Sequence, residues 1–147
     1  MGKLVVENLA LEAPETWIFF PMGEMIITRR DAGTGSLQIT RTYRNELRNT
    51  GSPSAFLAVA REFNKREGVS EPFDIVQVAE TDSLFGGFSY TAADDFGRVW
   101  YRLVDDQLVL GAYGCSRRQQ NSPDIVTEMA ECEQIMRSAR YASSVQR

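Results

Sequence analysis

The residues of this chain that could do acid–base chemistry are carboxylates, because the sequence contains no histidine. Histidine is the most frequent general base and a frequent metal ligand. Its absence excludes Ser–His and Cys–His nucleophile pairs and the histidine-containing zinc motifs. Two aspartate pairs remain, Asp94-Asp95 and Asp105-Asp106, and two facing carboxyl groups are what a glycoside hydrolase requires. Both pairs lie at predicted hairpin turns, where aspartate is favoured for its conformation alone, so we interpret them as turn residues.

Two other patterns could indicate a binding site. Gly33-Thr34-Gly35 has the composition of a phosphate-binding loop, but such a loop opens a helix and this segment precedes a predicted strand. A hairpin turn is therefore the better interpretation. Cys115 and Cys132 are too few for a metal site or a disulfide framework, and we expect a buried, unreactive thiol at Cys132. The sequence predicts no catalytic residue, no cofactor and no metal.

The overall composition is typical of a folded domain. The chain has 147 residues, of which 43% are hydrophobic and 24% charged, and we expect a single domain over residues 1–147. Its net charge of −4 disfavours a nucleic-acid partner, because phosphate neutralisation requires basic surface. Apolar runs such as Trp17–Phe20 are too short to cross a membrane, and the first eleven residues lack the apolar core of a secretory signal. We therefore expect a cytoplasmic protein without a membrane or nucleic-acid partner.

Arginine dominates the basic residues. Of 16 such residues only Lys3 and Lys65 are lysine, a bias that a G+C-rich genome or selection for bidentate anion pairing would produce. Arg41, Arg44 and Arg48 could form a surface for an acidic partner. The alternative is that they are solvated charges at sheet edges, where they discourage strand pairing.

Two amphipathic helices are predicted, each opened by a Ser-Pro pair. Ser52-Pro53 and Ser122-Pro123 place an N-cap serine before a proline at the first helical position. The apolar positions of the first helix, which ends at Gly68, are Phe56, Val59, Ala60 and Phe63, and those of the second are Ile125, Met129, Cys132, Ile135 and Met136. One-sided helices need an apolar surface to cover, so we expect both to pack on a sheet.

Seven strands are predicted from alternating apolar residues and from turns rich in glycine or aspartate. They cover residues 17–20, 24–30, 36–43, 73–81, 88–92, 98–104 and 107–115, with a bend or bulge at Gly86-Gly87. If Arg30 opposes Ser36, then Met25, Ile27, Leu37 and Ile39 share the apolar face of the first hairpin. Sequential strands with short connections favour antiparallel pairing. We therefore predict an α+β fold, an antiparallel β-sheet of six to seven strands with two main helices packed on it.

Some aromatic residues cannot be buried by simple strand alternation. Trp17, Phe19 and Phe20 cannot all face inward from one strand, so Phe20 faces outward if the other two face the core. Trp100 and Arg102 lie on the mixed side of a strand whose other side is wholly apolar. Because exposed aromatic patches are typical of interfaces, Phe20, Trp100 and Arg102 are candidate protein-interface residues. Cover by a terminal segment is the alternative.

Four features occur along the chain in a characteristic order. They are Pro14-Glu15-Thr16-Trp17 before the first strand, one helix after the third strand, the closing hairpin Val99–Tyr113, and a last helix ending in Ser138-Ala139-Arg140-Tyr141. In this order they resemble the superfamily that joins PsbP, the Ran-binding Mog proteins and the DcrB-like bacterial proteins, over residues 9–141. The resemblance implies the PsbP/Mog-like fold and a role in binding proteins, since some bacterial members are chaperones or adaptors for type VI secretion effectors. Unlike the DcrB-like lipoproteins, this chain has no lipid-attachment cysteine near its start.

The expected function is therefore a non-catalytic, bacterial protein-binding module, acting as an adaptor, chaperone or immunity protein for a secreted effector. One alternative is a small-ligand binder or a histidine-independent enzyme that uses Asp, Glu, Tyr and Arg in a pocket on the mixed face of the sheet. Another is a homodimer formed through the face of Trp100.

Overall fold

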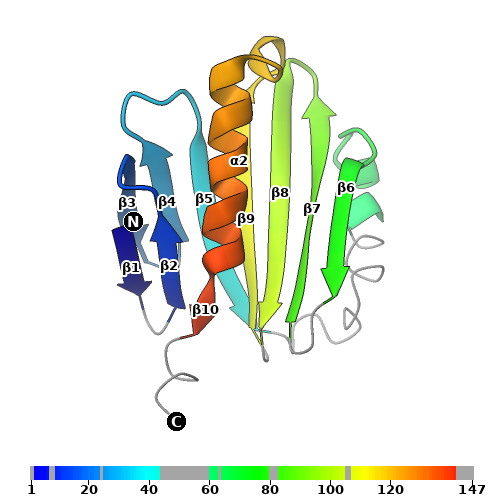
Figure 1. Cartoon of the computed structure of the whole chain (residues 1–147). Coiled ribbons are helices and arrows are strands. Elements are labelled where there is room, and N and C mark those ends of the chain that lie inside the picture. Colours follow the sequence, from blue (N-terminus) through cyan, green and yellow to red (C-terminus); the bar gives the residue numbers. More distant parts are fainter. Residues whose placement is uncertain are drawn as a thin grey trace.

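The computed structural model describes residues 2–6, 9–23, 25–43, 60–62, 64–79, 83–104 and 107–141. These residues form two antiparallel sheets and one long helix (Figure 1). The strands are β1 (Gly2–Val6), β2 (Leu9–Ala13), β3 (Trp17–Met22), β4 (Met25–Arg30), β5 (Ser36–Tyr43), β6 (Phe73–Ala79), β7 (Ser83–Ala92), β8 (Asp95–Val104), β9 (Gln107–Ser116) and β10 (Arg140–Tyr141), and the helices are η2 (Arg117–Gln119) and α2 (Pro123–Ser138). Over these ranges no helix combines the length and the apolar character that a membrane span requires.

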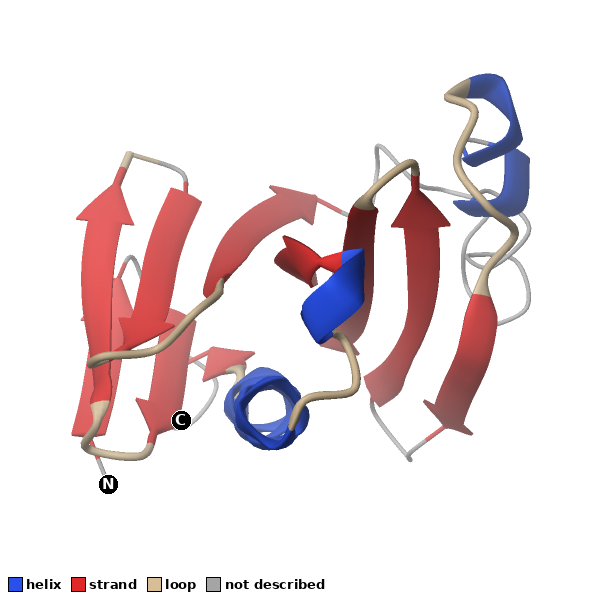
Figure 2. Cartoon of the chain, turned by 90° about the horizontal axis from the view of Figure 1, so that it is seen from above, coloured by secondary structure: helices blue, strands red, loops and turns tan. Residues whose placement is uncertain are grey.

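A seven-stranded sheet forms the body of the molecule, in the order β3-β4-β5-β9-β8-β7-β6. Every neighbouring pair in it is antiparallel, so the predicted α+β class and antiparallel sheet are confirmed. α2 lies across one face of this sheet, in contact with β8 and β9 (Figures 1 and 2). We call this the α2 face.

α2 begins where the sequence predicts. The hydroxyl of Ser122 accepts a hydrogen bond from the amide of Ile125 at 3.4 Å, and Pro123 is the first helical residue. The residues that the helix buries are Ile125, Glu128, Cys132, Ile135 and Met136. Four of these five were predicted from their spacing. Glu128 was not, because a charged residue is rarely buried without partners.

The end of α2 is tied to a second sheet through Ser138. Its hydroxyl accepts a hydrogen bond from the amide of Glu12 at 2.9 Å and donates to the carbonyl of Ile135 at 2.6 Å. The chain then reverses into β10, which pairs with β2. The Ser138–Tyr141 motif therefore has a structural role, since it joins the last helix to β2.

The second sheet, of order β1-β2-β10, was not predicted. It lies beside α2, in front of β3 and β4 in Figure 1, and β2 buries Leu9, Leu11 and Ala13 in the same core as α2. Their period of two was the available signal. The sheet was missed because β10 has two residues and pairs with a strand at the other end of the chain, a contact that no local pattern reveals.

The first predicted helix is described in part. Residues 60–62 and 64–66 are helical, whereas Ser52-Pro53, Phe56, Val59 and Phe63 lie outside the described residues. The helix ends as predicted at Gly68, whose φ of 71° lies in the left-handed region. Its amide donates to the carbonyl of Lys65, and the amide of Val69 donates to that of Asn64, which is the Schellman pattern of a helix end. These helical residues lie at the β6 end of the sheet, away from α2 (Figure 1).

The predicted register of the β4–β5 hairpin is wrong by one residue. Ile26 pairs with Ile39, and Thr28 pairs with Leu37. The core face therefore carries Ile26, Thr28, Leu37 and Ile39, and the opposite face carries Met25 and Ile27. A one-residue shift exchanges the two faces of a strand. Thr28 is accepted in the core because its hydroxyl donates to the carbonyl of Ile18 at 2.9 Å.

β7 runs without interruption through Gly86-Gly87, where a bend or bulge was predicted. Both glycines pair in register with Tyr101 and Trp100 of β8, and the register shift in this region lies in β6, between Phe73 and Val76. A Cβ on Gly86 would collide with the ring of Tyr101. The glycines therefore allow aromatic rings to lie over β7, and they do not turn the chain.

Candidate functional site

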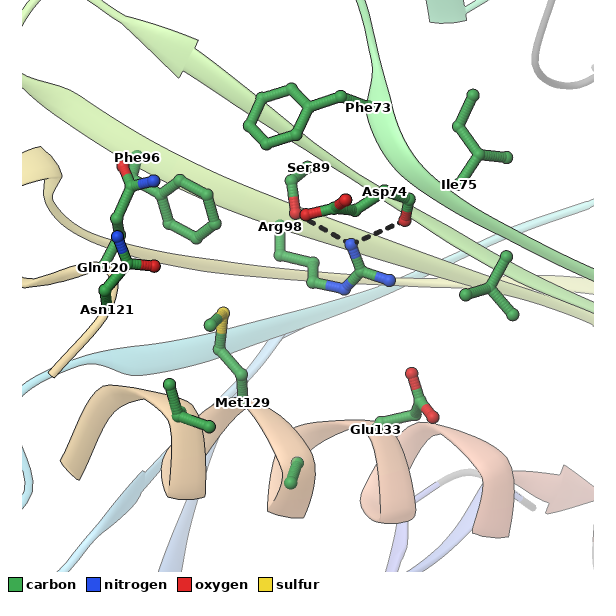
Figure 3. Close-up of a pocket in the computed structure, with 13 residues that line it drawn as sticks. Phe73, Asp74, Ile75, Ser89, Phe96, Arg98, Gln120, Asn121, Met129 and Glu133 are labelled. Carbon is green, nitrogen blue, oxygen red and sulfur yellow. Dashed lines mark hydrogen bonds between the residues drawn. The ribbon is translucent and has the colours of Figure 1, made fainter. Parts of the chain in front are cut away.

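A groove lies between α2 and the part of the large sheet formed by β6, β7 and β8 (Figure 3). Its volume is about 580 Å³, within the range of about 300–1,000 Å³ that is usual for ligand pockets. It forms because α2 contacts β8 and β9, whereas β7 and β6 continue the sheet beyond the helix (Figure 1). The mixed face of the sheet is thus partly covered by α2 and partly open. This is the face on which a ligand pocket was predicted as the alternative to a protein-binding function.

Arg98 of β8 is the only cationic side chain among the described residues that line the groove. Its Nη1 donates hydrogen bonds to the hydroxyl of Ser89 at 2.7 Å and to the carbonyl of Asp74 at 3.0 Å. The guanidinium carbon lies 5.8 Å from the centroid of the Trp100 ring. Three contacts from β6, β7 and β8 therefore hold this side chain in place.

The second edge of this guanidinium faces the groove. Nε and Nη2 of Arg98 donate to no residue in the described ranges, and they point from the sheet toward α2 (Figure 3). Two parallel N–H groups of this kind bind a carboxylate in bidentate fashion. Burial lowers the pKa of Arg98, and the charges of Glu133 and Asp74 oppose that shift. An arginine remains protonated at neutral pH, so the groove contains a permanent cation.

Two carboxylates lie on either side of this cation. Glu133 extends from α2; its Oε1 accepts a hydrogen bond from Nε1 of Trp100 at 3.2 Å, and its Oε2 lies 3.5 Å from Nε of Arg137. Asp74 is an exposed residue of β6 with a φ of 50°, at the position where the β6–β7 register shifts. The groove therefore presents one positive charge between two negative ones.

The remaining walls are mostly apolar. The rings of Phe73 and Phe96 lie 6.3 Å apart, and Ile75 and Val126 are 39% and 51% exposed on the rim. At one end, Oε1 of Gln120 is buried and has no hydrogen-bond partner among the described residues. A buried acceptor without a donor is unfavourable, so a ligand N–H or O–H at this end would gain free energy.

The described residues contain no group of three or more His, Cys, Asp or Glu that could hold a metal. Cys115 and Cys132 are both free. Cys132 is fully buried, as predicted, and burial raises the pKa of its thiol, as it does that of Cys115. Neither thiol has the lowered pKa that activates a nucleophilic cysteine.

The glycine-rich segment of the β4–β5 hairpin does bind an anion, but the anion belongs to this chain. The amides of Thr34 and Gly35 donate to the carboxylate of Glu128 at 2.9 and 3.0 Å. The hydroxyl of Tyr113 donates to Oε1 of the same carboxylate at 2.8 Å. Burial raises the pKa of Tyr113, and so does the adjacent Glu128 carboxylate. The turn interpretation is therefore correct, and the turn also fastens α2 to the hairpin.

A second surface feature lies on the face opposite α2, along β3 and β4. Ile18, Phe20 and Met22 alternate along β3 and are 42%, 41% and 60% exposed. Phe20 pairs with Ile27, and the guanidinium of Arg29 lies 5.7 Å from the centroid of the Phe20 ring. We call these five residues the β3–β4 apolar surface. It borders an edge of the sheet, because β3 has β4 as its one sheet neighbour in the described topology.

The structure separates the predicted interface residues. Phe20 is exposed, as the alternation in β3 predicted, with Trp17 buried behind it. Trp100 is fully buried beneath α2 on the opposite face, so a shared patch of Phe20 and Trp100, and a dimer through Trp100, are both wrong. Arg102 is partly buried and its Nε donates to the carbonyl of Ala139 at 3.0 Å, which places it at the end of α2 and not in a free surface.

The predicted basic surface is only partly described. Arg41 is half-buried in β5 and pairs with Val109, a core residue under α2, so it lies on the α2 face, opposite Phe20. Arg44 and Arg48 lie outside the described residues. Sequence reasoning predicted a pocket on the mixed face but named none of its residues. The available signal was Arg98, two positions before Trp100 on that face.

No family model matches the sequence, and no curated protein matches it. Solved structures do match in fold. The solution structure of cyanobacterial PsbP (CyanoP) from Synechocystis sp. PCC 6803 has a TM-score of 0.66 at 8% identity, covering 95% of this chain and 91% of that chain. The Ran-binding protein Mog1p of Saccharomyces cerevisiae has a TM-score of 0.65 at 10% identity, covering 98% and 96%. A Bacteroides thetaiotaomicron protein has a TM-score of 0.50 at 11% identity, covering 95% of this chain and 47% of that chain.

The first two matches extend over nearly the whole of both chains. The chain therefore has the PsbP/Mog-like fold.

Proposed function

We propose that this protein is a non-catalytic protein-binding module whose partner docks on the β3–β4 apolar surface. The observation that supports this proposal is the exposure of Ile18, Phe20 and Met22 on one face of an edge strand. Three large apolar side chains in a row are costly to leave in water, and contiguous apolar patches mark interaction sites.

The chemistry of this surface fits a protein partner. Phe20 and Arg29, whose guanidinium lies 5.7 Å from the centroid of the Phe20 ring, are residue types that are enriched at protein interfaces. The adjacent edge of β3 offers backbone groups to a strand of a partner. The fold supports the same class of function, since the yeast neighbour is described as a Ran-binding protein.

The finer proposal is an adaptor, chaperone or immunity protein for a secreted bacterial effector, acting in the cytoplasm. It follows from the resemblance to the DcrB-like bacterial proteins, some of which serve type VI secretion effectors. The groove supports a second candidate function, the binding of a small ligand, and the two functions use opposite faces of the sheet.

The test is affinity capture from the source organism with three forms of the tagged full chain. They are the natural protein, Phe20→Asp, and the matched control Val5→Asp, since Val5 is 59% exposed but lies in β1 of the other sheet. We expect one protein, identified by mass spectrometry, to be retained by the natural chain and by Val5→Asp and lost from Phe20→Asp. Its purified form should bind with a Kd at least about tenfold weaker to Phe20→Asp, the usual loss at a hot spot.

Equal retention by both variants would place the interface elsewhere. A shift from dimer to monomer in Phe20→Asp, measured by light scattering, would show that the surface binds a second copy of this chain and not another protein.

A further inference from the structure

We propose that the groove between α2 and β6–β8 binds a zwitterionic ligand with an apolar side chain, namely an apolar amino acid or a short apolar peptide with free ends. The ligand carboxylate binds the Nε–Nη2 edge of Arg98, and its ammonium group lies between Asp74 and Glu133. This inference does not depend on the proposed protein partner, because it concerns the opposite face of the sheet.

The carboxylate position follows from how Arg98 is held. One nitrogen, Nη1, donates to Ser89 and to the carbonyl of Asp74, and the cation–π contact with Trp100 is a third restraint on the guanidinium. The side chain is therefore oriented before a ligand arrives, and little conformational entropy is lost on binding. The remaining two N–H groups form the edge that binds carboxylates in bidentate fashion, and they face the groove (Figure 3).

The ammonium position follows from the charge pattern. Asp74 and Glu133 both act electrostatically on Arg98, and the ion pair that Glu133 makes is with Arg137. A simple anion in the groove would bind Arg98 but be repelled by the two carboxylates. A simple cation would be repelled by Arg98. A ligand that carries both a carboxylate and an ammonium group satisfies all three groups at once.

The apolar part of the ligand has a place as well. Phe73, Phe96 and Met129 lie around the polar centre (Figure 3), and the volume of about 580 Å³ accommodates an aromatic or branched side chain. The unpaired Oε1 of Gln120 lies toward the end of the groove near Phe96 (Figure 3). A peptide N–H reaching this oxygen would supply the donor that it lacks.

The experiment is isothermal titration calorimetry of the full chain with four defined probes. Phenylalanine and leucyl-phenylalanine carry both charges, N-acetylphenylalanine lacks the ammonium group, and phenethylamine lacks the carboxylate. We expect at least one of the first two to bind with a Kd below about 1 mM. The two singly charged probes should bind at least about tenfold more weakly, the usual effect of losing a charge-assisted hydrogen bond. Which of the first two binds more tightly distinguishes an amino acid from a peptide.

Two α2 variants test the location. Ala130 lines the groove and is exposed, so Ala130→Trp fills the groove without removing a contact. Thr127→Trp is the matched control, since Thr127 is an exposed α2 residue outside the groove lining. We expect the first variant to lose binding and the second to keep it. Arg98→Lys, which keeps the charge but loses the bidentate edge, should weaken binding about tenfold or more.

The proposal is overturned if neither phenylalanine nor the dipeptide binds, or if N-acetylphenylalanine binds as tightly as phenylalanine. It is also overturned if Ala130→Trp and Thr127→Trp bind the probe equally. A loss of the protein partner in Phe20→Asp with unchanged binding of the probe would show that the two surfaces act independently, as proposed.

Discussion

Replacing Glu128 should destabilise this protein more than any change to an exposed charge. The residue is 1% exposed, and its carboxylate accepts hydrogen bonds from the amides of Thr34 and Gly35 and from the hydroxyl of Tyr113. Glu128→Ala leaves three donors without an acceptor. The carboxylate is also the link that fastens the β4–β5 turn to the middle of α2.

The size of the effect can be worked out donor by donor. The Tyr113 hydroxyl is buried at 1% exposure, so its loss of partner costs about 1–3 kcal/mol. The two amides belong to an exposed and a half-buried residue and regain some water, which limits their cost to about 1 kcal/mol together. The space left by the side chain adds about 1 kcal/mol. The free energy of unfolding should therefore fall by about 3–5 kcal/mol, a large part of the 5–15 kcal/mol usual for a domain.

The measurement is urea unfolding of the natural protein and four variants, namely Glu128→Ala, Glu131→Ala, Tyr113→Phe and the double variant of Glu128→Ala with Tyr113→Phe. Glu131→Ala is the matched control, because Glu131 lies one turn from Glu128 on α2, and its side chain is 22% exposed with the carboxylate 3.6 Å from Nη1 of Arg30. This variant should lower the free energy of unfolding by about 1 kcal/mol or less. Tyr113→Phe should cost about 1–2 kcal/mol. In the double variant the losses should not add, because both changes remove the same hydrogen bond. If Glu128→Ala lies within about 1 kcal/mol of Glu131→Ala, with an unchanged m-value, the carboxylate is not the fastening point inferred here.

Two further outcomes test the surroundings of Tyr113. Gly35→Ala should lower the free energy of unfolding by about 1–3 kcal/mol through overpacking, because the new Cβ would lie 2.5 Å from the Tyr113 ring. The control Gly114→Ala, whose Cβ would have its nearest atom at 3.8 Å, should change it by no more than about 0.5 kcal/mol. Equal urea midpoints for the two variants would contradict this packing. Burial raises the pKa of Tyr113, Tyr101 and Cys132, so the folded state holds these protons more tightly than the unfolded state. The stability that these groups contribute to the folded state is fully present below the pKa values that they have in the unfolded chain. It decreases progressively above about pH 9–10. Urea midpoints should fall as the pH rises through that range, and less steeply in Tyr113→Phe; a flat profile would show that these groups ionise alike in both states.

The strands and the last helix were predictable because their signals are local. Alternating apolar residues marked the seven strands of the large sheet, and Ser122-Pro123 marked the start of α2. Gly68 likewise marked the end of the first helix. Each of these patterns involves residues that are close to one another in the sequence, so it can be recognised without knowledge of the tertiary structure.

The predicted exposure of Phe20 was correct and that of Trp100 was wrong, because the first depends on strand alternation and the second on cover by another element. Phe20 lies on a strand with two other aromatics, so alternation alone decides which of them faces outward. Trp100 lies beside Arg98 and Arg102 on a face that looks polar in sequence. The part of that face around Trp100 is buried because Glu133 of α2 accepts a hydrogen bond from Trp100 and the carbonyl of Ala139, the residue after α2, accepts one from Arg102.

The sequence by itself determined the fold class, the order along the chain of the seven strands of the large sheet, and the start of α2, since local propensity, capping and strand periodicity are properties of neighbouring residues. Only the tertiary structure decided the hairpin register, the second sheet, the burial of Glu128 and the groove around Arg98. In each of these, a polar or charged side chain is placed by a hydrogen-bond partner on another element, and that pairing compensates for the loss of contact with water.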